Sequence, residues 1–305
     1  RLEEVMSVPE IDVGEYSFDL RHPSVEVKTK GATRLGCPCW SGPPSRRDVP
    51  EHPHPARRCT SRPGGALFIT GFPAGSWATN CYVVATGAGE PCVVIDPGQE
   101  SIDGVHEIIG EHRLAPAAVL LTHGHMDHIW SVAPLAREFE IPALIHTDDR
   151  YRLADPAGSS MAAAREQLLA MTKNSLELTE PDDVQLLPPG RDAEIELVGI
   201  RFAVRHAPGH TEGSAVFQAE RGDDVDVLFS GDVLFQGSIG RTDLPGGSPD
   251  QMNESLRDVI WPMADEIVVL PGHGPRTTIG AERASNPFLQ AVGSGRDAQA
   301  PNRGW

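Results

Sequence analysis

The amino-acid sequence predicts an α/β fold in which two sheets pack against each other and helices cover their outer faces. Three observations lead to this prediction. Short apolar runs rich in β-branched residues alternate with segments of helical periodicity. The alternation occurs in two successive blocks, which suits a layered domain. Potential metal ligands follow the ends of apolar runs, as expected for loops at the carboxyl ends of strands.

The first block begins at Ala66. Its expected strands are 66–72, 79–85, 91–98 and 117–124. Between the third and the fourth, apolar residues recur near the helical period at Ile102, Val105, Ile108 and Ile109, so residues 101–114 are predicted to form an amphipathic helix. Further helices are expected at 128–138, 147–153 and 160–171.

The second block is expected to contain five strands, at 193–198, 200–206, 214–219, 225–230 and 266–272. A helix is expected before the last strand, at 249–261, and a final helix after it, at 281–289. We therefore assign residues 66–290 to one folded domain and residues 291–305 to a polar tail.

Residues 1–65 differ in amino-acid composition and periodicity from the rest of the chain. From Gly31 to Gly65 the chain is rich in Pro, Gly and Arg and has no periodic apolar pattern. This stretch therefore cannot bury enough apolar surface to offset the conformational entropy that it would lose on folding. We expect a disordered extension, or translated sequence upstream of the true start. Its Cys and His residues (Cys37, Cys39, His52, His54 and Cys59) lack the spacing of zinc modules and are not expected to bind metal.

Charge and composition exclude several classes of protein. The formal net charge is −17, and residues 1–65 hold 10 basic and 9 acidic side chains of the chain's 26 and 43, so the acidity belongs to the remainder. An acidic surface argues against a nucleic-acid partner.

No apolar run approaches the roughly 18 residues of a membrane span, and no secretory signal is visible, although a removed leader stays open because the chain begins at Arg1. Five cysteines do not form a disulfide framework, which favours a cytoplasmic protein.

The segment "LLTHGHMDHIW" (120–130) concentrates potential metal ligands directly after an apolar run: His123, His125, Asp127 and His128. Three other strand ends carry similar residues. His210 follows "RFAVRHAPG", Asp232 follows "VDVLFSG", and His273 follows "EIVVLPG". Loops at one edge of a layered domain would bring these seven residues together.

The residue types suit two divalent ions about 3.5 to 4 Å apart, which need imidazoles on each ion and a carboxylate that can bridge them. Imidazole ligands favour zinc, with iron or manganese as alternatives, over calcium or magnesium.

The motif "THGHMDH" resembles the H-x-H-x-D-H signature of the metallo-β-lactamase superfamily. "APGHTEGS", "SGDVLF" and "LPGHGP" resemble the remaining ligand motifs of that superfamily, in the same order. The resemblance covers about residues 67–287 and does not include residues 1–65. "GSIGRTDLPGGS" (237–248) and "ERASNPFL" (282–289) are similar to the glyoxalase II-like thioester hydrolases, particularly the short bacterial forms.

The resemblance implies an αββα sandwich and a role for each ligand. His123, His125 and His210 would hold the first metal ion. Asp127, His128 and His273 would hold the second, and Asp232 would bridge both. A metal-bridging hydroxide would attack a thioester carbonyl, and Asp127 would orient it and accept its proton.

The resemblance implies the type of reaction, but it leaves the thiol of the thioester substrate open. Only 32 residues follow His273, which leaves no room for the helical domain with which full-length glyoxalase II grips glutathione. The expected partner is a small-molecule thioester, of glutathione or of another thiol; oligomeric state is open. Arg241 could pair with a substrate carboxylate, or with Asp243 in a structural role.

Two other functions remain as alternatives. A persulfide dioxygenase of the same superfamily would bind one iron through His123, His210 and Asp232 and leave the other ligands idle. A noncatalytic metal-binding module is the alternative of another class, although such a protein has no need for an open two-metal site.

Overall fold

The computed structural model describes residues 67–155, 179–188, 190, 192–220 and 225–297, together with two short strands, β1 (Tyr16–Ser17) and β2 (Lys28–Thr29). Strands β1 and β2 pair only with each other and belong to neither of the larger sheets. The expected helix at 160–171, the cysteines and histidines of residues 37–59 and the end of the tail lie outside the described residues.

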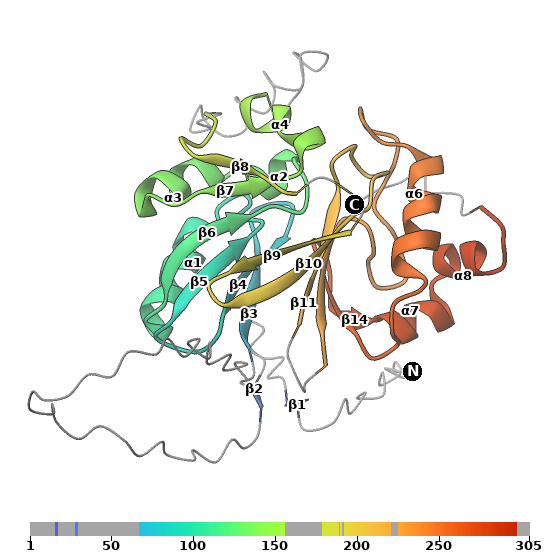
Figure 1. Cartoon of the computed structure of the whole chain (residues 1–305), viewed down its shortest axis with the longest axis horizontal. Helices are drawn as coiled ribbons and strands as arrows, with labels where there is room; N and C mark the ends of the chain where they lie inside the picture. Colours follow the sequence, from blue (N-terminus) through green and yellow to red (C-terminus); the bar gives the residue numbers. More distant parts are fainter. Residues whose placement is uncertain are drawn as a thin grey trace, which may run out of the picture.

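The first block forms a six-stranded mixed sheet in the order β3-β4-β5-β6-β7-β8 (Figure 1). Its strands are β3 (Phe68–Ala74), β4 (Thr79–Ala85), β5 (Pro91–Ile95), β6 (Ala115–Leu120), β7 (Ala143–Ile145) and β8 (Val184–Leu186). The first three are antiparallel, and β5 to β8 are parallel. The three-residue strands β7 and β8 were not predicted, because so few residues carry no periodicity.

The second block forms another six-stranded mixed sheet, in the order β14-β13-β12-β11-β10-β9. Its strands are β9 (Asp192–Leu197), β10 (Ile200–His206), β11 (Ala215–Ala219), β12 (Val227–Gly231), β13 (Val268–Pro271) and β14 (Thr277–Thr278). Only the pair β12–β13 is parallel. All strands expected for this block are present, and the two-residue β14 is additional.

Several expected helices are divided. Helix α1 (Ile102–His112) forms as predicted, but the single helix expected at 128–138 is two, α2 (Met126–Ile129) and α3 (Val132–Phe139). The helix expected at 147–153 is a 3₁₀ turn, η1 (Thr147–Asp149), followed by α4 (Tyr151–Ala154).

The later helices also differ from expectation. Helix α6 (Pro249–Ser255) continues into a π-helical turn, η3 (Leu256–Ile260). The final helix is split into α7 (Ile279–Ser285) and α8 (Pro287–Gly293), because Pro287 holds Asn286 in an extended conformation. Helix α8 therefore passes the expected domain end at residue 290.

The core has three layers of apolar packing, which confirms the αββα sandwich. Between the sheets, residues such as Ile95 and Leu120 face Phe202, Phe217 and Phe229. The outer face of the first sheet packs on α1, α2 and α3, and the outer face of the second packs on α6, η3, α7 and α8 (Figure 1). Among the described residues, no helix has the length and apolar character needed to cross a membrane.

Candidate metal centre

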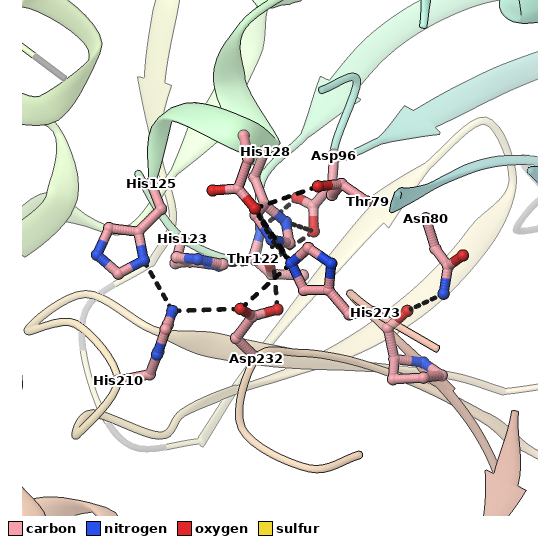
Figure 2. Close-up of polar contacts among 12 residues, drawn as sticks. Thr79, Asn80, Asp96, Thr122, His123, His125, His128, His210, Asp232 and His273 are labelled. Carbon is pink, nitrogen blue, oxygen red and sulfur yellow. Dashed lines mark hydrogen bonds and ion pairs between the residues drawn. The ribbon is translucent and has the colours of Figure 1, made fainter. Parts of the chain in front are cut away.

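The seven predicted ligands converge at one edge of the sandwich, where strands of both sheets end. Figure 2 labels all of them except Asp127. His123 follows β6, and His125, Asp127 and His128 lie on the turn into α2 and on α2 itself. From the second sheet, His210 follows β10, Asp232 follows β12 and His273 follows β13. Each sheet thus supplies part of the cluster, and the cluster lies where the two sheets meet.

One half of the cluster consists of His123, His125 and His210, each of which offers one ring nitrogen within 4.8 Å of the nitrogens offered by the other two. The His125 Nδ1 and His210 Nε2 atoms are 2.7 Å apart. Nitrogens this close together can be ligands of a single ion.

The other half consists of Asp127, His128 and His273. His273 Nε2 lies 3.1 Å from Asp127 Oδ2 and 3.3 Å from His128 Nε2. Asp232 stands between the halves: its Oδ2 is 3.3 Å from His210 Nε2, and its Oδ1 is 3.3 Å from His128 Nε2. A carboxylate in this position can bridge two ions.

Two atoms of the cluster indicate that it suits a metal. Among the described residues, His123 Nε2 is buried without a hydrogen-bond partner, and Asp232 Oδ1 has only the ion-pair contact with His128 Nε2 and no hydrogen bond. A buried polar atom left without a partner is costly, so such atoms in a native protein need an explanation. Here both belong to residues that form a His–His–Asp group with His128. Imidazole and carboxylate donors in this number fit divalent transition metals.

The pKa values of the histidines shift in opposite directions in the two halves of the cluster. Burial, together with neighbouring imidazoles, holds the pKa values of His123 and His125 well below the usual range, so both rings are neutral and able to donate a lone pair. Burial would also lower the pKa of His128, but Asp232 and Asp127 outweigh it and raise that pKa well above normal. Burial opposes ionisation of Asp127 too, yet His128 and His273 lower its pKa to about 2. The carboxylates therefore make the second half favourable for positive charge.

Further residues orient the histidines through their outer nitrogens. Asp96 Oδ2 accepts from His128 Nδ1 at 3.0 Å and from Thr122 Oγ1 at 2.6 Å. The Arg241 backbone oxygen accepts from His210 Nδ1 at 2.7 Å, and the Trp77 oxygen accepts from His273 Nδ1 at 3.1 Å. Such partners fix ring orientation and tautomer. Sequence reasoning missed Asp96, although it too follows a buried strand in "PCVVIDPG" and the rule that found His123 applies to it.

Arg241, the predicted substrate contact, and three other reactive side chains lie outside the seven-residue cluster. The guanidinium of Arg241 forms a bidentate pair with Asp243, at 2.7 and 2.8 Å, and its role toward substrate stays a prediction. His146 stacks on His206 with ring centroids 3.9 Å apart. Cys81 and Cys92 are fully buried free cysteines, and burial raises the pKa values of both thiols, that of Cys92 to about 12, so neither thiol is a nucleophile.

The family model of the metallo-β-lactamase superfamily matches residues 74–273, which include all seven predicted ligands and every strand of the two sheets except β3 and β14. This protein belongs to the metallo-β-lactamase superfamily, a superfamily of metal-dependent hydrolases.

Two curated proteins are similar to this chain over nearly all of their own length. Protein Mb2612c of Mycobacterium bovis is 45% identical over 74% of this chain and 99% of its own length. Hydroxyacylglutathione hydrolase GloC of Haemophilus influenzae is 33% identical over 72% of this chain and 97% of its own length.

Solved structures of similar proteins confirm the fold. BLEG-1, a B3 metallo-β-lactamase, has a TM-score of 0.61 and 36% identity over 72% of this chain and 99% of its own. TTHA1623, solved in a di-iron-bound form, has a TM-score of 0.57 and 36% identity, covering 70% and 96%. ETHE1 from Myxococcus xanthus has a TM-score of 0.52 and 26% identity, covering 70% and 80%.

Proposed function

We propose that this protein is a binuclear metallohydrolase that cleaves a small-molecule thioester, as a hydroxyacylglutathione hydrolase does. The observation that carries the proposal is the arrangement of seven ligands in two adjoining groups joined by Asp232. The similarity to GloC over nearly all of that protein's length supports the thioester as substrate.

His123, His125 and His210 would hold one ion, and Asp127, His128 and His273 the other. When bound, two divalent ions supply a water molecule of lowered pKa and polarise the carbonyl under attack. We favour zinc, with iron or manganese as alternatives; the di-iron form of TTHA1623 supports a two-ion centre and keeps iron in consideration.

We assign Asp127 the task of orienting the attacking water and receiving its proton. Its side chain is partly exposed, unlike that of His128, and its Oδ2 accepts a hydrogen bond from Thr79 Oγ1 at 3.1 Å. That bond and the neighbouring His273 fix the carboxylate at the open side of the cluster. A thiolate leaves readily, so the site needs no strong general acid. The buried free cysteines also suit a reducing compartment, and we propose a cytoplasmic location.

A persulfide dioxygenase is the second candidate, because the similarity to ETHE1 is consistent with it. It would use one iron on His123, His210 and Asp232. The geometry favours the hydrolase, since Asp127, His128 and His273 form a complete group that the dioxygenase would not use.

Metal content and activity, measured on the same sample, test the proposal. We expect about two ions per chain by elemental analysis and hydrolysis of S-lactoylglutathione or another thioester. His125→Ala and Asp127→Ala should each lower kcat/KM at least about 100-fold, because the nucleophile and the stabilisation of the developing oxyanion depend on the cluster. His106→Ala is the matched control, since His106 is a partly exposed residue of α1.

Three other outcomes would contradict the proposal. One iron per chain with oxygen consumed on glutathione persulfide would identify the dioxygenase. Cleavage of a β-lactam without thioester cleavage would place the protein with its neighbour BLEG-1. Bound metal with no turnover of any of these substrates would leave the noncatalytic module.

A further inference from the structure

Asp149 is a buried carboxylate outside the ligand set. It lies at the end of η1, after β7, and has no exposed surface. Its Oδ2 accepts hydrogen bonds from the Gly124 backbone nitrogen and from Thr211 Oγ1, both at 2.7 Å. Its Oδ1 accepts from the Gly213 nitrogen at 2.9 Å and from Arg152 Nε at 3.3 Å. Four donors to one buried carboxylate make a rigid junction.

Three of these donors, Gly124, Thr211 and Gly213, belong to the two loops that carry one half of the metal centre. Gly124 lies between His123 and His125, and Thr211 directly follows His210. The two loops come from different sheets, and the Ala215 nitrogen donates to the Thr122 oxygen at 2.8 Å beside the junction. Asp149 therefore joins the loop of His125 to the loop of His210, whose rings meet at 2.7 Å.

The junction leaves little room for the loops to move. A Cβ atom on Gly213 would lie 2.6 Å from the Asp149 nitrogen and 2.7 Å from its Cγ. A Cβ atom on Gly124 would lie 2.8 Å from the Cβ of Arg152. Such distances are below van der Waals contact, so both positions require glycine for close approach.

Arg152 extends the junction to a third loop. It is buried, and its Nη2 donates to Glu212 Oε2 at 2.8 Å and to the Pro245 oxygen at 3.0 Å. The loop of Pro245 begins near Arg241, whose oxygen orients His210. Arg152 also offsets the charge of Asp149, which is what a buried carboxylate requires.

The other half of the centre has a separate support. His128 is oriented by Asp96, and His273 by the Trp77 oxygen, and none of the hydrogen bonds of Asp149 reaches either. The two halves are thus positioned by different residues.

We propose that Asp149 is a positioning residue that holds the His125 and His210 loops together and thereby sets the affinity of the first metal site but not of the second. This inference rests on the two-ion centre of the proposed function. It predicts a selective effect, which a general structural role would not produce.

Zinc titration of the chelator-stripped full-length protein, in competition with a chromophoric chelator, tests the inference. In Asp149→Asn an amide nitrogen replaces one acceptor, so at least one loop loses its bond. We expect one of the two zinc affinities to fall by about 10- to 100-fold, as is usual when a residue supporting a ligand is changed. The binding curve should resemble that of His125→Ala and differ from that of His273→Ala. Asp103→Asn, which makes the same exchange at an exposed position of α1, is the control and should bind as the wild type does.

Equal affinities in Asp149→Asn and the wild type would overturn the inference, and so would an equal loss at both sites. If Asp149→Asn does not fold, Thr211→Val decides the question, because it removes one bond to Asp149 and keeps the buried charge pair; unchanged zinc binding in that variant would also overturn it. A wild-type protein that hydrolyses no thioester would refute the proposed function alone, since zinc binding is measured without substrate.

Discussion

At the scale of single residues, Asp96 supports the second half of the centre. It is buried, and it accepts from the Thr122 nitrogen at 2.9 Å as well as from the Thr122 hydroxyl and His128. Its φ of 49° is in the left-handed region, which Asn tolerates better than other non-glycine residues do. Asp96→Asn therefore changes the hydrogen bonding of His128 without a new backbone strain.

We predict that Asp96→Asn weakens zinc binding by about 10- to 100-fold, because an amide is a poorer acceptor for His128 than a carboxylate and no longer raises its basicity. The competition titration described above measures the effect. Asp103→Asn, an exposed change on α1, is the control. Unaltered affinity in Asp96→Asn would show that the ring of His128 is held in place by packing alone.

At the scale of elements, the junction between α7 and α8 supports a ligand loop. Asn286 Oδ1 caps α8 by accepting from the Phe288 and Leu289 nitrogens at 3.0 and 3.4 Å. Its Nδ2 donates to Glu282 Oε2 at 2.8 Å and to the Ser238 oxygen at 3.0 Å. The Gly237 nitrogen also donates to Glu282, so the two helices hold the loop that leads from Asp232 to Arg241.

We predict that Asn286→Ala lowers the free energy of unfolding by about 2 to 4 kcal/mol. Losing the cap costs about 0.5 to 2 kcal/mol, and leaving buried acceptors without donors adds about 1 to 3 kcal/mol. Urea denaturation measures the change. Ser248→Ala is the control, because Ser248 caps α6 through a single bond of 3.3 Å to the Gln251 nitrogen. A loss in Asn286→Ala no larger than that of Ser248→Ala would contradict the role of the junction.

At the scale of the whole molecule, the sandwich is complete without residues 1–65. Both six-stranded sheets and the apolar layers are formed by residues from Leu67 onward, and β1 and β2 add to neither sheet.

We predict that a chain beginning at Ala66 keeps its stability and its thioesterase activity, with a change in melting temperature below about 3 °C, which corresponds to roughly 1 kcal/mol in a domain of this size. Calorimetry of the two chains measures it, and activity per bound metal serves as the control. A large fall in melting temperature would show that residues 1–65 are part of the folded unit.

The sequence by itself determined the class of fold and the approximate position of most elements, because apolar periodicity follows directly from which face of a strand or helix is buried. It also determined which residues to consider as ligands, since His and Asp at strand ends are a local pattern. It did not predict β7, β8 or β14, which exist because neighbouring strands supply their hydrogen bonds. Helix ends were misplaced where one residue, such as Asn286, ends one helix and caps the next.

Only the tertiary structure decided how closely the predicted ligands approach one another and which residues support them. The 2.7 Å contact between His125 and His210 joins residues 85 positions apart, and it depends on how the two sheets pack. Asp149 had no pattern to mark it: the three donors from the ligand loops lie 25 to 64 residues away, and its neighbours Asp148 and Arg150 are exposed. A local sequence pattern indicates which residues are buried and where strands end. The role of a buried carboxylate depends instead on the loops that surround it, and these are brought together only by the fold.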